Sequence, residues 1–230
     1  CFIKKFYKNQ VDEQKLLENN GKLFLSSDRS NAVKQAENQN YDIAIFDDGL
    51  QDETIDYDLR FVCFNNINWI GNGMTIPAGP LRESLKRTDE ADFIVSSSKL
   101  TRLKTKHNNY LMNYQPIEWA RIKDNKRFNA NSWPLSKNVH AVAGIGNPAK
   151  FFNTLISLGL NPIRHSFPDH YQFKEEDLDF GDTLPIIMTE KDAVRCLEMN
   201  SNNLWYLSVE AKFENEDLAE NILNKLTINK

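Results

Sequence analysis

The chain has 230 residues, enough to bury a sizeable core as one large domain or two small ones. Its 28 basic and 32 acidic residues give a net charge of -4, and this balance argues against a nucleic-acid partner. The three cysteines, Cys1, Cys63 and Cys196, are far apart and fit neither a zinc site nor a paired disulfide framework. No apolar run approaches the roughly 18 to 20 residues that span a bilayer.

Apolar segments alternate with helical patterns along most of the chain. The predicted strands are Lys22 to Leu25, Asp42 to Phe46, Arg60 to Phe64, Asp92 to Ser96, Val139 to Ala143, Ile186 to Thr189 and Leu204 to Val209. The predicted helices are Arg29 to Glu37, Pro148 to Leu158, Glu190 to Met199 and Asn215 to Leu226. Such alternation predicts an α/β fold with a mostly parallel sheet flanked by helices.

Between Tyr110 and Trp133 the pattern changes to aromatic, β-prone segments with polar interruptions. This change predicts an antiparallel hairpin that joins two α/β parts. We place the boundary near 131–138, so that residues 1–130 form one domain and residues 131–230 a smaller second one.

The first candidate site is Asp47-Asp48-Gly49, which directly follows the predicted strand Asp42 to Phe46. Open α/β sheets bind their ligands at the carboxyl ends of the strands. An aspartate placed there can hold the Mg²⁺ that bridges nucleotide phosphates, as a Walker B aspartate does. An ordinary surface turn explains Asp-Gly equally well, so the motif alone leaves both interpretations open.

Two glycine-containing stretches follow. The loop from Ile70 to Glu83 is rich in Gly and Pro and ends in Arg82-Glu83, a charge pair that is explained either by a ligand or by solvent. Gly144-Ile145-Gly146 follows a predicted strand, but without a third glycine it indicates close strand-to-helix packing more than a nucleotide site.

Two further motifs lie in the carboxyl-terminal half. In Ser166 to Phe173, His170 stands between an acidic residue and aromatic residues in a predicted loop. In Met188 to Val194, Thr189 ends a strand and can cap the following helix, and its acidic neighbours suit the helix dipole. Capping is enough to explain this second motif.

Taken in order, these five stretches resemble the tetraacyldisaccharide 4'-kinase family, the lipid A kinases of Gram-negative bacteria. The resemblance covers nearly the whole chain: Asp-Asp-Gly-Leu-Gln, Pro-Ala-Gly-Pro-Leu-Arg-Glu, Gly-Ile-Gly-Asn-Pro, Phe-Pro-Asp-His and Met-Thr-Glu-Lys-Asp-Ala-Val. Val11 to Gln14 is similar to the family's Gly-Asp-Glu-Pro element, and Ser27 to Arg29 to its later Asp-Arg step, over shorter stretches.

The resemblance implies a P-loop NTPase-like fold and a lipid kinase. Such an enzyme uses ATP and Mg²⁺ to phosphorylate the 4'-hydroxyl of an acylated glucosamine disaccharide 1-phosphate in lipid A synthesis. It would act as a peripheral protein on the cytoplasmic face of the bacterial inner membrane. The basic cluster between Lys99 and Lys106 is either a solvated surface or a contact with anionic lipid.

The same resemblance assigns roles to individual residues. It makes Asp48 the Walker B ligand of Mg²⁺, supported by Asp47 and Gln51. It makes His170 and Asp12 the pair that activates the sugar hydroxyl, which suits an imidazole whose tautomer is fixed by a carboxylate. The remaining nucleotide and substrate contacts that it implies are Arg29, Arg82 and Glu83.

Two departures from the family bear on activity. Asp52 stands where the family usually has histidine, and Val11 replaces the glycine before Asp12. The family's Walker A loop lies upstream of its Gly-Asp-Glu-Pro element, and the 230 residues contain no Gly-rich stretch that ends in Gly-Lys-Ser/Thr. We therefore expect the chain to be a fragment with little activity alone. The alternative is a non-catalytic protein that binds the lipid disaccharide and has lost its ATP site.

Overall fold

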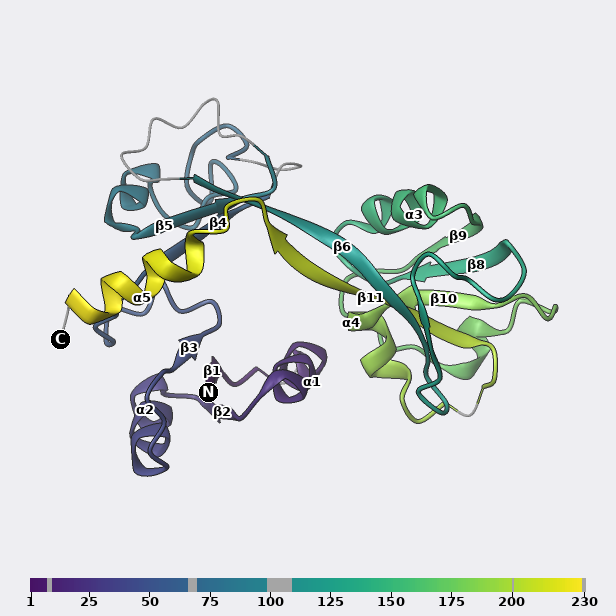
Figure 1. Cartoon of the computed structure of the whole chain (residues 1–230), viewed down its shortest axis with the longest axis horizontal. Coiled ribbons are helices and arrows are strands. Elements are labelled where there is room, and N and C mark those ends of the chain that lie inside the picture. Colours follow the sequence, from purple (N-terminus) through teal and green to yellow (C-terminus); the bar gives the residue numbers. More distant parts are fainter. Residues whose placement is uncertain (8–9, 66–69, 99–108, 200, 229–230) are drawn as a thin grey trace. The chain divides into compact units, whose positions relative to one another are not determined.

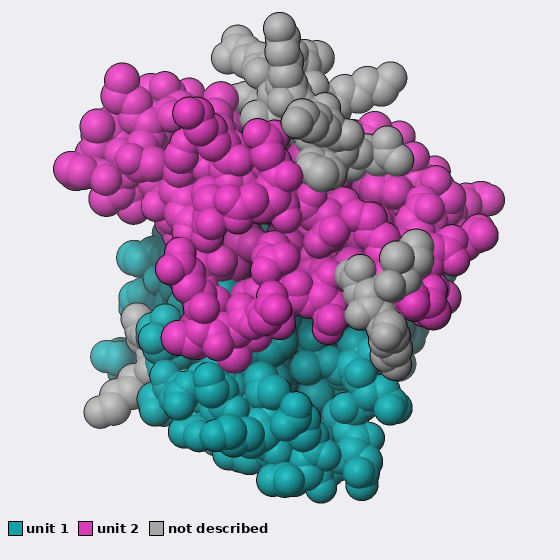
Figure 2. Space-filling view, turned by 90° about the vertical axis from the view of Figure 1, so that its left-hand side faces the viewer, with its two compact units in different colours: residues 1–49, 116–210 teal, residues 50–115, 211–230 magenta. Residues whose placement is uncertain are grey.

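A computed structural model describes residues 1–7, 10–65, 70–98, 109–199 and 201–228. The chain divides into two compact units (Figures 1 and 2). Unit 1 comprises residues 1–49 and 116–210, and unit 2 comprises residues 50–115 and 211–230. The predicted basic cluster between Lys99 and Lys106 lies outside the described residues.

The amino-terminal part of unit 1 is a three-stranded parallel sheet in the order β2-β1-β3. Its elements are β1 (Phe2–Lys5), α1 (Val11–Asn20), β2 (Leu23–Ser26), α2 (Arg29–Asn38) and β3 (Ile45–Phe46). Asp28 caps α2 by accepting a hydrogen bond from the Ser30 amide at 2.9 Å. A small core of Ile3, Phe24 and two alanines of α2 stabilises the sheet. This packing fixes the position of the carboxyl end of β3.

The second part of unit 1 is a larger sheet in which β11, β10, β8 and β9 run parallel in that order. Its strands are β8 (Asn138–Ala143), β9 (Asn161–Ser166), β10 (Ile186–Thr189) and β11 (Leu204–Phe213). Its helical segments are α3 (Pro148–Ser157), η2 (Glu175–Leu178), α4 (Glu190–Ala193) and η3 (Val194–Cys196). Pro148 begins α3, whose buried face carries Phe151, Phe152 and Leu155. These side chains join the main core of the unit.

Strand β6 (Asn109–Arg121) lies beside β11 in this sheet and pairs with β7 (Arg127–Asn129) as an antiparallel hairpin. Both β6 and β11 continue from one unit into the other. Within unit 2, β6 pairs with β5 (Phe93–Ser96), which pairs with β4 (Phe61–Phe64), both in parallel. The unit also contains the 3₁₀ helix η1 (Leu85–Glu90) and α5 (Leu218–Ile228), whose Leu218 is buried with Phe93 and Tyr110.

The predicted α/β class, the mostly parallel sheets and the hairpin between Tyr110 and Trp133 are confirmed. The predicted strand from Asp42 was wrong in length, since only Ile45 and Phe46 pair with β1. The predicted helix from Glu190 to Met199 is also shorter, because α4 gives way to a 3₁₀ turn at Val194. Strands β1 and β9 and helix α1 were not predicted: α1 has two acidic residues in its first turn and a weak apolar periodicity.

The boundaries of the compact units differ from the predicted domain boundary at 130/131. The reason is that β6 and β11 each contribute residues to both units, so the chain leaves unit 2 through β6 and returns to it through β11, with no linker at 130/131. The division into residues 1–130 and 131–230 remains a prediction about functional modules. Among the described residues, no helix combines the length and the apolar character needed to cross a membrane.

The edge of the larger sheet carries a histidine pair. His140 on β8 and His165 on β9 approach at 2.9 Å through Nδ1 and Nε2, while the other His140 nitrogen lies 3.1 Å from a carboxylate oxygen of Asp182. The Phe180 ring stacks on both imidazoles. Burial, together with the charge of His140, lowers the pKa of His165 below its ordinary value of 6.5. The pair therefore favours a neutral His165.

We predict that this pair makes unfolding sensitive to mild acid. Because the folded pKa of His165 is lowered, its stabilising contribution is present above about pH 6.5 and is lost as the pH falls toward the folded pKa. The melting temperature should therefore fall between about pH 7 and 5. His165→Asn should flatten that slope, whereas replacement of the exposed Arg164 beside it by Gln should not. An unchanged slope in His165→Asn would contradict the assignment.

A second prediction concerns Trp119, whose side chain is fully buried in the core of unit 1. Its indole N–H donates to the Ala130 carbonyl at 2.9 Å, and its ring packs edge-on against Trp133. Trp119→Ala should cost about 3 to 5 kcal/mol of unfolding free energy in a urea titration. The control is Tyr114→Ala on the exposed part of the same strand, which should cost about 0.5 kcal/mol or less. Equal effects would refute the position of Trp119 in the core.

Candidate active site

The site begins at the amino end of α1. Asp12 and Glu13 occupy its first turn, where the helix dipole and the unpaired amide groups favour negative charge. Asp12 is almost fully buried, at 3% exposure, whereas Glu13 is half-buried. A buried carboxylate is stable only when charged or hydrogen-bonding partners surround it. The partners of Asp12 come from the far end of the chain.

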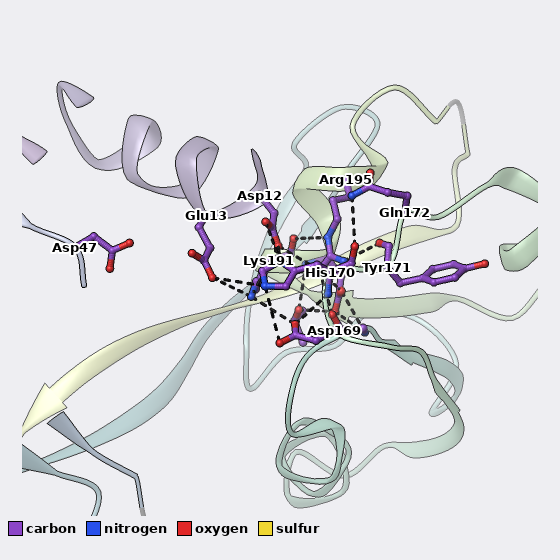
Figure 3. A network of polar contacts seen from close by, with 12 residues as sticks. Asp12, Glu13, Asp47, Asp169, His170, Tyr171, Gln172, Lys191 and Arg195 are labelled. Atoms are coloured by element: carbon purple, nitrogen blue, oxygen red, sulfur yellow. Dashed lines mark hydrogen bonds and ion pairs between the residues drawn. The ribbon is translucent and has the colours of Figure 1, made fainter. Parts of the chain in front are cut away.

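The first partner is His170, in the loop between β9 and η2. Its Nδ1 lies 3.1 and 3.2 Å from the two carboxylate oxygens of Asp12, across 158 residues of sequence. Figure 3 shows the two side chains pointing toward each other from the helix and the loop. Because a carboxylate accepts hydrogen bonds, the neutral imidazole in this geometry carries its proton on Nδ1 and keeps the lone pair of Nε2. The structure thus brings together the two residues that the family resemblance pairs.

The backbone of His170 is strained, with φ of +59° in the left-handed region. Its amide donates to the Asp169 carboxylate at 3.0 Å, which helps to hold this conformation. Such strain costs on the order of 1 to 3 kcal/mol and is concentrated at functional positions. The loop therefore presents the imidazole from a left-handed backbone position that the Asp169 carboxylate supports.

Cations of α4 and η3 complete the cluster. The Lys191 ammonium lies 3.2 Å from Glu13, 3.6 Å from Asp169 and 3.8 Å from Asp12. Arg195 approaches the same Asp12 carboxylate at 3.5 Å. Thr189 caps α4 by accepting a hydrogen bond from the Asp192 amide. The predicted cap is confirmed, and it also aims a lysine at the buried aspartate.

The second corner of the site lies at the end of β3. Asp47 forms a close ion pair with the buried Lys4 of β1, which also contacts Glu13 at 2.9 Å. Burial by itself would lower the pKa of Lys4, but the hydrogen bonds and charges of Asp47 and Glu13 outweigh it and raise the pKa above 10.5. Lys4 thus remains charged and connects this corner to α1.

The next residue, Asp48, has φ of +51° and an exposed side chain. Buried Arg29 donates to the carbonyl oxygens of Asp48 and Asp47, at 2.8 and 3.3 Å. Arg29 therefore holds the turn through its backbone. Asp47 is paired with Lys4, and the side chain of Asp48 is exposed, so this corner carries two adjacent carboxylates. Carboxylate oxygen fits Mg²⁺, which usually binds one or two carboxylates and completes its shell with water and phosphate.

The remaining predicted residues belong to unit 2. Gln51 is exposed and follows the Asp-Asp-Gly turn. In the loop before η1, Arg82 is exposed, and Glu83 pairs with Arg87 at 3.0 Å. Arg87 also meets Glu53 at 3.6 Å. Glu83 is thus anchored within its own unit.

Sequence reasoning missed four polar residues of the site: Lys4, Glu13, Lys191 and Arg195. The sequence held one indication for Lys4. It shares one face of a short strand with apolar residues, and a lysine in such a position is buried only when it has a charged or hydrogen-bonding partner. Lys191 and Arg195 stand four residues apart, which places them on one face of a helical turn. Their target, however, lies about 180 residues away in the sequence, so no local pattern identifies it.

The chain matches the family model described as tetraacyldisaccharide-1-P 4'-kinase over residues 8–227. A protein of Pelagibacter ubique named tetraacyldisaccharide 4'-kinase is 38% identical, over 98% of this chain and 73% of its own. Proteins of the same name from Hahella chejuensis and Pseudomonas putida W619 are 40% and 37% identical over 74% and 82% of this chain. The chain spans 49% and 56% of the length of those two relatives.

Among solved structures, the chain is similar to one described as the "apo" form of LpxK from Aquifex aeolicus in complex with ATP. The TM-score is 0.76, with 22% sequence identity, over 97% of this chain and 78% of that one. At this identity the likeness establishes the fold.

Glu13 allows a test of the ion-pair network through the pH dependence of stability. Burial alone would raise the pKa of Glu13, but Lys4 and Lys191 outweigh it and hold the pKa below the ordinary value of 4.5. Its contribution to stability is therefore present above pH 4.5 and is lost as the pH falls through the folded pKa. We predict that Glu13→Gln lowers the unfolding free energy by about 1 kcal/mol at neutral pH, and that this difference shrinks in acid.

The measurement is chemical unfolding of both proteins between about pH 7 and 3.5. Glu37→Gln, which replaces an exposed carboxylate on α2, is the matched control and should match the parent protein throughout. A Glu13→Gln difference that stays constant in acid would contradict the network.

Proposed function

Because the chain belongs to the tetraacyldisaccharide 4'-kinase family, we propose that it is a lipid kinase of lipid A synthesis. The reaction transfers the γ-phosphoryl group of ATP to the 4'-hydroxyl of a tetraacylated glucosamine disaccharide 1-phosphate. The observation that carries this proposal is the contact between His170 and buried Asp12, at the amino end of α1.

In this proposal His170 is the general base. Asp12 holds Nδ1–H, so Nε2 is the nitrogen that accepts the proton of the sugar hydroxyl as the oxygen attacks phosphorus. The carboxylate then stabilises the imidazolium that forms. Glu13 and Asp169, each 3.9 Å from Nε2, add favourable negative charge for that cation. Phosphoryl transfer depends mainly on positioning and on charge neutralisation, and a base of this kind contributes about 10² to 10⁴ in rate.

The corner at Asp47 and Asp48 is proposed to hold Mg²⁺. When bound, the ion neutralises charge on the β- and γ-phosphates. Asp48 supplies the exposed carboxylate, Lys4 fixes Asp47 beside it, and Arg29 supports the turn through the two carbonyl oxygens. These contacts support assigning Asp48 as the direct ligand and Asp47 and Arg29 as its support.

Gln51, Arg82 and Glu83 remain proposed contacts to nucleotide and substrate. Arg82 is exposed at the end of the Gly- and Pro-rich loop, where a guanidinium can pair with a phosphate. The family name specifies an acylated disaccharide as substrate, and acyl chains keep such a molecule in a bilayer. We therefore propose that the protein works as a peripheral protein at the cytoplasmic face of the inner membrane.

The test is transfer of ³²P from [γ-³²P]ATP to tetraacyldisaccharide 1-phosphate with Mg²⁺. For this assay, the family's Walker A segment is joined to the amino end of the chain, because the 230 residues contain no such motif. We predict that His170→Ala lowers kcat by about 10² to 10⁴. Asp48→Ala should lower it by about 10² or more, since phosphate charge is then neutralised less well.

The matched control is Asp56→Ala, which removes a fully exposed carboxylate of unit 2 and should leave turnover unchanged. Near-normal turnover in both His170→Ala and Asp48→Ala would refute the assigned roles. Saturable binding of the disaccharide without any phosphorylated product would favour the non-catalytic binding protein instead.

A further inference from the structure

Asp192 is a fully buried carboxylate that the proposed chemistry does not use. Its oxygens accept hydrogen bonds from the Gly144 amide at 3.2 Å and from the Thr189 hydroxyl at 2.6 Å. Its third partner is the Arg195 guanidinium at 2.8 Å. Burial raises the pKa of Asp192, and these partners act in the opposite direction. The side chain of a buried charge with this many partners is held rigidly in place.

Arg195 connects Asp192 to Asp12 and to the loop that carries His170. Its Nη2 lies 3.5 Å from the Asp12 carboxylate and donates to the Gly144 carbonyl at 3.2 Å. Its Nη1 donates to the carbonyl of Tyr171, the residue after His170, at 2.7 Å. Figure 3 shows the guanidinium between α1 and the His170 loop.

We propose that Arg195, anchored by Asp192, is a positioning residue that holds Asp12 and the His170 loop in register for proton transfer. The inference rests on the proposed function, since it assumes that the pair handles the proton of the sugar hydroxyl. The predicted geometry, in which Arg195 fixes the position of Asp12 relative to His170, does not depend on that reaction.

The chemistry of arginine suits this task. The planar guanidinium offers five N–H groups in a fixed arrangement, so one side chain can hold two carboxylates and two carbonyl oxygens together. The side chain of Arg195 is only 4% exposed, and its guanidinium packs on the Phe173 ring. A lysine would keep the charge but has a single nitrogen to share among these partners.

Gly144 shows how tightly the arrangement is built. A Cβ at this position would lie 3.2 Å from an Asp192 oxygen, 3.2 Å from the Pro168 carbonyl and 3.3 Å from Phe173. These distances are tighter than most side-chain contacts, so a residue with a side chain would push Asp192 or the His170 loop away. Gly144 of the Gly144-Ile145-Gly146 motif is therefore explained by close packing against Asp192 and the His170 loop.

The experiment measures the tautomer of His170 by long-range ¹H–¹⁵N correlation in the chain labelled with ring-¹⁵N histidine. At about pH 8.5 an ordinary imidazole is neutral. In the parent protein we expect the Nδ1–H form of His170. In Arg195→Gln the ratio of Nδ1–H to Nε2–H should fall about tenfold, the effect of weakening one charge-assisted hydrogen bond. Arg195→Lys should give an intermediate ratio.

Two controls separate positioning from general loss of stability. Leu155→Ala opens a cavity in the core of unit 1 and lowers the melting temperature, but it should leave the His170 tautomer unchanged. Arg164→Gln removes an exposed arginine of β9 and should change neither. A parental tautomer ratio in folded Arg195→Gln or Arg195→Lys would overturn the proposal, as would an equal shift in Leu155→Ala.

Turnover gives an independent result in the protein that carries a Walker A segment. Arg195→Gln should lower kcat about 10- to 100-fold, the cost of a misplaced base, with KM for ATP within about twofold. In a His170→Ala background the same change should have no further effect on kcat, because Arg195 acts through His170. A full additional loss there would overturn the proposal. Absence of turnover in every variant would refute the kinase assignment, while the tautomer ratio would still decide the positioning role.

Discussion

The site depends on how the charge of Asp12 is neutralised inside the protein. The carboxylate is 3% exposed on α1, and its partners His170, Lys191 and Arg195 all come from the loop and helical segments that follow strands of the larger sheet of unit 1. Removing one member of such a set leaves the buried charge less well compensated, which destabilises the folded protein. The two sheets of unit 1 are therefore joined by a polar contact. Its hydrogen bonds and ion pairs are lost when the two parts shift, whereas an apolar contact would tolerate a small shift.

The same contact continues toward the end of β3. Glu13 lies between Lys191 and Lys4, and Lys4 in turn contacts Asp47. Charges of opposite sign thus alternate from the His170 loop to the proposed metal corner. Each cation has a carboxylate on either side, so its position is fixed from two directions. A displacement of α1 would consequently disturb the proposed base and the proposed Mg²⁺ ligands together.

Sequence patterns predicted the elements whose own residues decide their structure. The α3 helix, with Pro148 at its start and Phe151 and Phe152 on one face, is an example. Helix α1 could not be predicted in this way, since the residues of its first turn contact α4 and the His170 loop and do not form an apolar stripe. The pairing of Asp12 with His170 came from family resemblance, because nothing local marks two residues 158 positions apart as neighbours. Lys191 was missed for a related reason: a helix cap already explained its motif.

The proposed base and the proposed Mg²⁺ ligand share one backbone feature. His170 and Asp48 both have left-handed backbones, which residues other than glycine adopt at a cost of about 1 to 2 kcal/mol. In each case a buried arginine binds a main-chain carbonyl of the strained turn: Arg195 the carbonyl of Tyr171, and Arg29 that of Asp48 itself. A guanidinium can satisfy such carbonyls while its other nitrogens contact the rest of the structure. The strain therefore persists because tertiary contacts determine these turns, and each turn aims its side chain in a direction that a relaxed loop would not maintain.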